Sequence, residues 1–128
     1  MHDDSTRTGV NGRLREISRD SSTFSDTALR LLANDRRRYT LYYLWNRPDS
    51  VVEVAELHDF CSTALGLDET SRDHLYVELL HHHLPMLDDA SALTYDSRTG
   101  TVRYSGGDSL ERILEKTSRL DDVQLHSV

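Results

Sequence analysis

Histidine is the residue type whose spacing in this chain first suggests chemistry. Four of the seven histidines lie close together in the sequence, at His74, His81, His82 and His83. Imidazole nitrogens are common ligands of transition metals, so a metal site is one interpretation of this cluster. The surrounding pattern predicts a helix, however, and consecutive residues of a helix point about 100° apart. The three consecutive histidines therefore cannot all face one ion, and we predict no metal site and no cofactor.

The same helix could instead present a surface to DNA. Residues near the N-terminus of a recognition helix reach the base edges in the major groove. We expect four side chains of this helix to contact DNA: Arg72, His74, His81 and His82. His83, next to Leu84, is expected to pack against the core. Asp73 and Glu78 lie on the same helix and favour the alternative, in which this is an ordinary solvent-exposed face.

Arginine supplies the other candidate contacts, because a guanidinium group can pair with phosphate through two hydrogen bonds. The one run of consecutive basic residues is Arg36-Arg37-Arg38, at the expected start of a helix. Positive charge at a helix start is unfavourable to the helix dipole, so a purely stabilising role is less natural for this run. Arg98 and Arg103 lie on a predicted hairpin, from which they would contact the DNA backbone or minor groove. The alternative for each arginine is an ordinary exposed side chain.

Motifs for catalysis are missing from the sequence. It contains no glycine-rich phosphate loop, no nucleophile elbow and no paired metal-binding motif. Its single cysteine, Cys61, falls at an apolar helical position, which is typical of a buried and unreactive thiol. We therefore expect a protein that is not an enzyme and has no small-molecule substrate.

The charge composition counts against simple electrostatic attraction to DNA. The net charge is −7, with 22 acidic residues, 15 of them aspartate, against 15 basic residues, 14 of them arginine. Scarce lysine and abundant aspartate resemble the proteins of salt-loving archaea, although a GC-rich genome would also favour arginine. At molar salt the Debye length is about 3 Å, so long-range repulsion matters little and local contacts can still hold phosphate.

The elements that must position these residues follow from the spacing of apolar side chains. Helical spacing predicts helices at about 25–34, 36–45, 53–65, 70–88 and 108–119. Val51-Val52 is expected to form a short edge strand. Pro85 lies inside the fourth helix and must kink it near residues 81–84 or begin a new turn.

A tight hairpin follows the fourth helix at once. Leu93 and Tyr95 alternate with polar residues, as do Val102 and Tyr104, and residues 96–100 between them have turn chemistry. A helix followed directly by a hairpin is typical of a winged helix-turn-helix. We predict a mainly α fold with a small β-hairpin (α+β), a winged helix-turn-helix with an added C-terminal helix.

One domain with tails suits a chain of 128 residues. The expected parts are a disordered polar arm at 1–23, the winged helix-turn-helix at 24–105, the C-terminal helix at 106–120 and a disordered tail at 121–128. No apolar stretch approaches the roughly 20 residues of a membrane-spanning helix, and the polar start is not a signal peptide. We expect a soluble, cytoplasmic protein that does not enter a membrane.

The C-terminal helix carries Leu110, Ile113, Leu114 and Thr117 on one face. A helix this short is not stable alone, so this face must pack against something. Terminal helices of winged-helix regulators often form dimers, and a two-fold dimer would match a palindromic DNA site. We favour a homodimer through this helix, and the alternative is packing on the first helices of the same chain.

Three segments carry a family resemblance: LLANDRRRYTLYYL at 31–44, VVEVAELHDF at 51–60 and HLYVELLHHHLPMLDDASALTYDSRTGTVRY at 74–104. They resemble a haloarchaeal family of winged-helix domains of unknown function, and HHLPMLDDASAL is distantly similar to the end of the recognition helix in ArsR-type transcriptional repressors. Ser91 stands where the family usually has glycine. A serine costs of order 1 kcal/mol more than glycine in a left-handed helix stop, which suggests a different helix end.

The resemblance implies the winged fold and, by analogy, a DNA-binding transcriptional regulator. Its recognition helix would span about 70–88 and its wing 93–104, with double-stranded DNA as the partner. The alternative is a winged-helix module for protein–protein interaction that does not bind DNA, which the net charge of −7 favours. A regulator should show a positive patch joining Arg72, Arg98 and Arg103. An interaction module should show an acidic recognition face and an exposed apolar groove.

Overall fold

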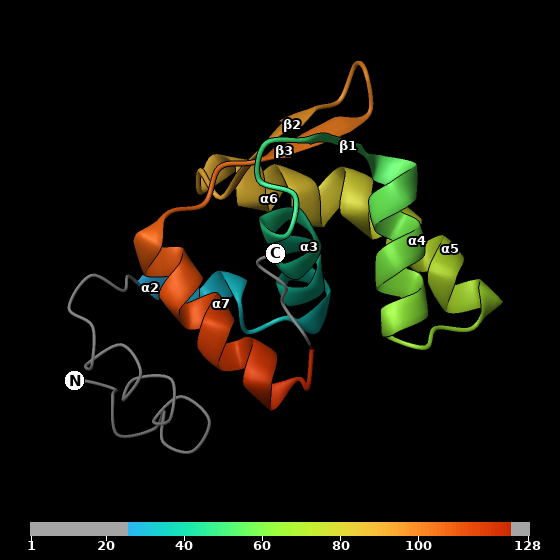
Figure 1. Cartoon of the computed structure of the whole chain (residues 1–128). Coiled ribbons are helices and arrows are strands. Elements are labelled where there is room, and N and C mark those ends of the chain that lie inside the picture. The colour runs from blue at the N-terminus through green and yellow to red at the C-terminus, as the bar shows by residue number, and fades with distance from the viewer. Residues whose placement is uncertain (1–25, 124–128) are drawn as a thin grey trace, which may run out of the picture.

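Helices lie against a small antiparallel sheet in the computed structural model, which describes residues 26–123 (Figure 1). In chain order the elements are α2 (Asp26–Leu31), α3 (Asp35–Trp45), β1 (Val51–Glu53), α4 (Val54–Ala64), α5 (Glu69–Glu78), the π-helical segment η2 (Leu79–His83), α6 (Leu84–Asp89), β2 (Leu93–Asp96), β3 (Thr101–Tyr104) and α7 (Asp108–Leu120). The predicted arm at 1–23 lies outside the described residues, as do residues 124–128 of the predicted tail.

The sheet has the strand order β1-β3-β2 with both neighbours antiparallel. Val102 in the central strand pairs with Val52 of β1 and Tyr95 of β2. Val52 and Val102 are buried while Arg103 is exposed, which is the alternation of a sheet with one covered face. The hairpin β2–β3 and the short edge strand β1 both form where they were predicted. The predicted α+β class, mainly helical with a wing-like hairpin, is confirmed.

The predicted recognition helix is one continuous helical stretch of α5, η2 and α6 over residues 69–89. In its middle, the Leu84 N–H donates to the Leu79 carbonyl five residues back, which makes η2 a π-helical turn. This wider turn comes directly before Pro85, whose ring would clash with the carbonyl four residues back in a regular α-helix. The distortion therefore lies where Pro85 predicted it, and the helix continues as α6.

Ser91 follows this helix with a backbone φ of +65°, in the left-handed region. Its N–H donates to the Asp88 carbonyl at 2.9 Å, and the Ala92 N–H donates to the Leu87 carbonyl at 2.9 Å. These two hydrogen bonds form a Schellman motif, the usual glycine-based helix stop. The expectation of a different helix end is therefore wrong. The left-handed stop is kept, with serine in the place of glycine.

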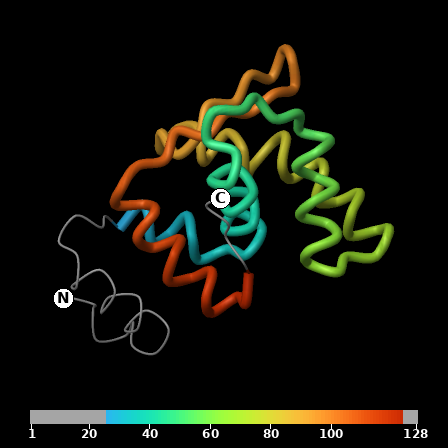
Figure 2. The backbone as a smooth tube through the Cα atoms, in the orientation of Figure 1, coloured from blue at the N-terminus to red at the C-terminus, as the bar shows by residue number. Residues whose placement is uncertain are grey.

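Helix α7 packs on α3 within the chain, at the opposite side of the molecule from α4 and α5 (Figure 2). Ile113 and Leu114 are completely buried, and Leu110 and Thr117 nearly so. Beyond the end of α7, the Asp121 carboxylate accepts a hydrogen bond of 2.6 Å from the hydroxyl of Tyr42 in α3. The apolar face that we expected at a dimer interface is thus already buried within one chain.

Candidate nucleic-acid interface

The predicted histidine contacts lie on the surface of the recognition helix. His74 on α5 and His81 and His82 on η2 are all exposed. His83 is buried, as expected, with 3% of its surface accessible. The cluster thus divides into three surface side chains that can meet a ligand and one core side chain that cannot.

Arg72 is held against the neighbouring helix. Its guanidinium NH2 lies 3.3 Å from Asp59 Oδ1 on α4, and about a third of its side chain, 34%, is accessible. The backbone carbonyl of the same residue is 2.7 Å from His58 Nε2, also on α4. Arg72 can reach a phosphate only by leaving or sharing a carboxylate partner.

The wing presents a highly accessible candidate contact. The Arg98 side chain is 89% exposed and lies at the hairpin tip, with Nε 3.9 Å from Asp96 Oδ1. The tip is ordered by Asp96, whose Oδ1 accepts hydrogen bonds from the backbone N–H groups of Arg98 and Thr99. Gly100 closes the turn with φ +68°. Arg103 on β3 is exposed as well. The hairpin therefore offers two arginines on a well-ordered support.

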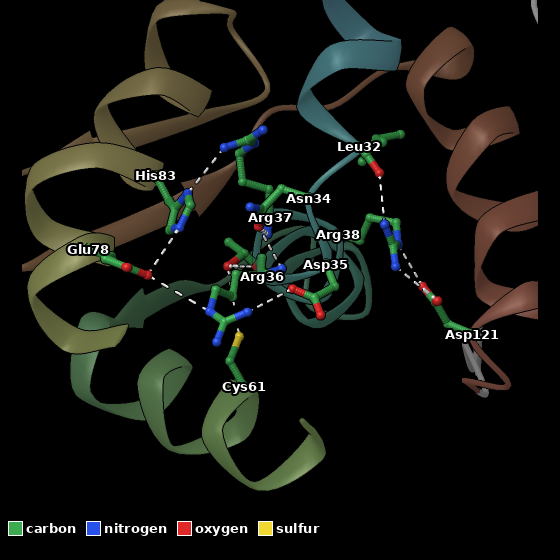
Figure 3. A network of polar contacts seen from close by, with 11 residues as sticks. Leu32, Asn34, Asp35, Arg36, Arg37, Arg38, Cys61, Glu78, His83 and Asp121 are labelled. Atoms are coloured by element: carbon green, nitrogen blue, oxygen red, sulfur yellow. Dashed lines mark hydrogen bonds and ion pairs between the residues drawn. The ribbon is translucent and has the colours of Figure 1, made fainter. Parts of the chain in front are cut away.

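Arg37 is a structural residue that contacts η2, the middle segment of the predicted recognition helix (Figure 3). It is buried, with Nε 2.8 Å from the Leu31 carbonyl and NH2 3.2 Å from the Arg30 carbonyl. These carbonyls are at the C-terminal end of α2, where backbone acceptors need partners. Its NH1 lies 3.3 Å from His83 Nδ1. All three guanidinium nitrogens of Arg37 already have an acceptor and only 8% of the residue is accessible, so we leave it out of the candidate surface.

Arg38 connects α3 to the residues that directly follow α2 and α7 (Figure 3). Its Nε and NH2 donate to the two oxygens of Asp121 at 2.7 and 3.0 Å, and NH1 donates to the Leu32 carbonyl at 3.1 Å. The carboxylate of Asp121 raises the pKa of Arg38, against the lowering effect of burial, which is the largest single contribution. Such a two-pronged pair fixes α7 to α3 and leaves Arg38, like Arg37, outside the candidate surface.

Arg36 is the partly exposed member of the run and lies near an acid of the predicted recognition helix. Its NH1 lies 3.1 Å from Asp35 Oδ1 and its Nε lies 3.8 Å from Glu78 Oε1, with 31% of the side chain accessible. The guanidinium group of Arg36 is thus already paired with two carboxylates. The predicted run of three phosphate contacts therefore separates into one half-exposed arginine and two that hold the fold together.

The buried His83 has a defined protonation state. Because a guanidinium group can only donate, Nδ1 of His83 must accept from Arg37, which places the ring proton on Nε2, 3.7 Å from Glu78 Oε1. Burial, and next the positive charge of Arg37, lowers the pKa of His83 to about 4. The ring is therefore neutral at neutral pH. The contact with Arg37 could not be predicted from the sequence, because the two residues are 46 positions apart.

The recognition face also carries acidic and apolar side chains. Asp73 and Glu78 are exposed beside the histidines. Tyr76 and Val77 are 40% and 56% exposed, which is high for residues of their size. The predicted contacts therefore lie on a mixed surface, in which Arg98 and Arg103 on the wing are the arginines least engaged by carboxylates.

Residues 29–103 match the sequence profile of a family described as Domain of unknown function (DUF7344). The chain belongs to this family. The match runs from the end of α2 into β3, so the DUF7344 region contains every candidate DNA contact and excludes α7. No curated protein and no solved structure matches the chain. The predicted haloarchaeal origin and the distant link to ArsR-type repressors stay predictions.

Residues 26–123 of this DUF7344 protein contain no helix that is long and apolar enough to cross a membrane. In the same residues, no three His, Cys, Asp or Glu side chains gather closely enough to hold a metal ion. Cys61 is completely buried, and burial raises the pKa of its thiol to about 12. The thiol is therefore protonated at neutral pH and a poor nucleophile.

Proposed function

We propose that this DUF7344 protein is a DNA-binding transcriptional regulator of the winged-helix type. The observation that carries the proposal is the wing: Arg98 is 89% exposed at an ordered hairpin tip, with Arg103 exposed on the strand behind it. In winged-helix proteins, the recognition helix enters the major groove and the arginines of the wing contact the backbone or minor groove. On the recognition helix, His74, His81 and His82 are accessible to base edges and phosphates.

DNA binding is tested by fluorescence anisotropy with labelled random-sequence duplexes and promoter fragments, over a series of KCl concentrations up to the molar range. We expect the double variant Arg98→Ala/Arg103→Ala to bind about tenfold more weakly at moderate salt, because two phosphate contacts are lost. The slope of log affinity against log salt should fall by about 2. Arg119→Ala on α7 removes a similarly exposed arginine outside the proposed surface and should leave affinity unchanged.

Two outcomes would count against this assignment. A wild-type chain that retains no duplex at any salt concentration contradicts DNA binding itself. If the double variant Arg98→Ala/Arg103→Ala binds DNA as tightly as the wild type does, the assigned face is contradicted. Circular dichroism of each variant would show that the fold is intact before affinities are compared.

A second function has its own support, namely a module for protein–protein interaction. Tyr76 and Val77 are exposed on the same helix as the carboxylates Asp73 and Glu78, so the helix offers apolar side chains among acidic ones. Aromatic side chains of this kind are frequent anchors of protein interfaces. If wild type retains no DNA, this function takes precedence, and Tyr76→Ala and Val77→Ser should then weaken binding of the partner protein.

The other predictions remain part of the proposal. We infer a cytoplasmic protein of haloarchaeal type, distantly related to ArsR-type repressors, with no catalytic activity. A homodimer remains proposed as well. It would need a surface other than the apolar face of α7, because that face packs inside the chain.

A further inference from the structure

The buried positions of the predicted recognition helix recur every fourth residue, at Leu75, Leu79, His83 and Leu87. This period is slightly longer than the 3.6 residues of a regular α-helix, because η2 contributes a wider π-helical turn. With the same period, His74 and His82 fall on one stripe beside the buried positions, and His81 falls on the stripe opposite them. All three side chains are exposed. These outer histidines therefore lie on neighbouring stripes of the solvent-facing surface.

The charge of this surface depends on its histidines. Between positions 72 and 82, the side chains that are charged throughout the neutral pH range are Arg72, Asp73 and Glu78, with a net charge of −1. Arg72 is moreover paired with Asp59 of α4. Histidine is the side chain whose charge ordinarily changes between pH 5 and 8. Three protonated histidines would bring the net charge of this segment to +2, the sign that attracts phosphate.

The arginines of α3 are directed at other groups of the helix (Figure 3). Arg36 Nε lies 3.8 Å from Glu78 Oε1, and Arg37 NH1 lies 3.3 Å from His83 Nδ1. The ring of His82 lies 4.9 Å from the ring of His83, which is neutral at neutral pH. Helix α3 therefore supplies no cation that would contact a ligand in place of the histidines.

The elements before α5 contribute one further cation and three groups that bind within the chain. On α4, His58 and Asp59 both contact Arg72. Asp68 caps α5, and its pKa is lowered first by hydrogen bonds from the first turn of that helix and then by the charge of His74. His74 therefore lies within electrostatic reach of a carboxylate that is fixed at the helix start.

Helix α6, which continues the same helical stretch, carries two acids. Asp88 Oδ2 accepts a hydrogen bond of 3.0 Å from the backbone N–H of Tyr95, and Asp89 is exposed at the end of the helix. Within residues 26–123 the outer histidines form no ion pair with any of these groups. Their imidazole rings are therefore open to protons from solvent and to a bound anion.

We propose that the outer histidines contact the phosphates of DNA as imidazolium groups, so that DNA binding by this protein takes up protons. The proposal rests on the DNA-binding function proposed above and adds to it a regulation by pH. A negative charge next to an imidazole favours the protonated form. Because linkage is reciprocal, a fall in pH then raises the affinity for DNA.

The pH dependence is measured by fluorescence anisotropy with random-sequence duplexes at constant ionic strength, between about pH 8 and pH 5.5. We expect the wild type to bind about 30-fold more tightly at the lower pH, since each of three phosphate contacts gains roughly threefold. The slope of log affinity against log salt should also steepen by about 3. Circular dichroism at each pH would show that the fold is intact, because protonation of the buried His83 lowers stability in this range.

Two triple variants separate the charge of the histidines from their shape. His74→Gln/His81→Gln/His82→Gln should bind at every pH about as weakly as the wild type does at about pH 8. His74→Arg/His81→Arg/His82→Arg carries a fixed charge at the same positions. It should bind at about pH 8 at least as tightly as the wild type does at about pH 5.5, and its affinity should not change with pH. The wing variant Arg98→Ala/Arg103→Ala is the matched control, since it should bind more weakly at every pH while keeping the wild-type pH dependence.

The possible failures are distinguishable. A wild type that binds the duplex with equal affinity at both ends of the pH range overturns this proposal and leaves the DNA-binding function standing. A glutamine variant that keeps the wild-type pH dependence overturns the assignment to the outer histidines. A folded wild type that retains no duplex at any pH overturns the proposed function and this proposal together.

Discussion

At the scale of single residues, the candidate DNA contacts fall into two kinds: side chains that are exposed, and side chains that are buried and already paired within the chain. His83 and Arg37 lie in the same sequence clusters as the exposed histidines and Arg36, yet they face the interior and satisfy each other. The position of His83 next to Leu84 predicted that this ring would be packed. The role of Arg37 was not predictable, because its acceptors are the carbonyls of α2 and a ring nitrogen on a distant helix.

The buried His83 makes stability dependent on pH. Its folded pKa is about 4 against an ordinary value of 6.5, so the unfolded chain takes up the proton first as the pH falls. The contribution is therefore fully present above about pH 6.5 and is lost between pH 6.5 and 4, by at most about 3 kcal/mol. His83→Asn keeps an acceptor for Arg37 without titrating, and should flatten this part of the curve in urea unfolding at several pH values.

The exposed neighbour is the matched control for that experiment. His82→Asn removes a histidine of the same cluster from the surface and should leave the loss of stability below pH 6.5 as in wild type. An equal pH dependence in wild type and His83→Asn would contradict the assignment of this dependence to the buried ring.

Ser91 gives a second prediction at this scale. It holds φ +65° in a helix stop, a conformation that costs a side chain about 1 kcal/mol relative to glycine. Ser91→Gly should therefore raise the free energy of unfolding by up to about 1 kcal/mol, measured by thermal or urea unfolding. Ser97→Gly places glycine in the hairpin turn, where φ is not positive, and should give no gain. A destabilised Ser91→Gly chain would show that the serine contributes something beyond this motif.

At the scale of elements, the helical stretch 69–89 and the hairpin were predictable because their signals are local. Alternating apolar residues and a turn sequence specify the hairpin, and Pro85 specifies where the helix must depart from α geometry. The partner of α7 could not be inferred in this way. From the sequence, the apolar face of α7 could pack either on a second chain or on a helix of the same chain. The structure decides between the two, because Ile113 and Leu114 are completely buried within one chain.

The packing of α7 predicts that its apolar face stabilises the monomer. Ile113→Ala should lower the free energy of unfolding by about 2–5 kcal/mol, the range for a fully buried aliphatic residue. The mass in light scattering should stay unchanged. Lys116→Ala, on the exposed side of the same helix, should change stability by less than about 0.5 kcal/mol. A variant that halves its mass without losing stability would instead place Ile113 at a dimer interface.

At the scale of the whole molecule, sequence reasoning reached the fold class and a domain family of unknown function, but it could not show which charges are free. Net charge gives a sum over the chain, whereas a binding face depends on which arginines lack carboxylate partners. Arg98 is nearly unpaired, Arg72 is paired with Asp59, and Arg38 is fully engaged. These pairings join residues from 2 to 83 positions apart, and tertiary structure alone brings the distant ones together.

The Arg72–Asp59 pair has a consequence for how DNA affinity would depend on salt. A free arginine that contacts a phosphate releases about 0.9 of a condensed counterion into solution, and this release is favourable at low salt. Arg72 is instead already paired with Asp59. When its guanidinium group moves to a phosphate, the Asp59 carboxylate is left without that partner and attracts a cation from solution. The net release of ions for this contact is close to zero. Arg72 could then hold a phosphate at high salt with little loss, while the contacts of Arg98 weaken.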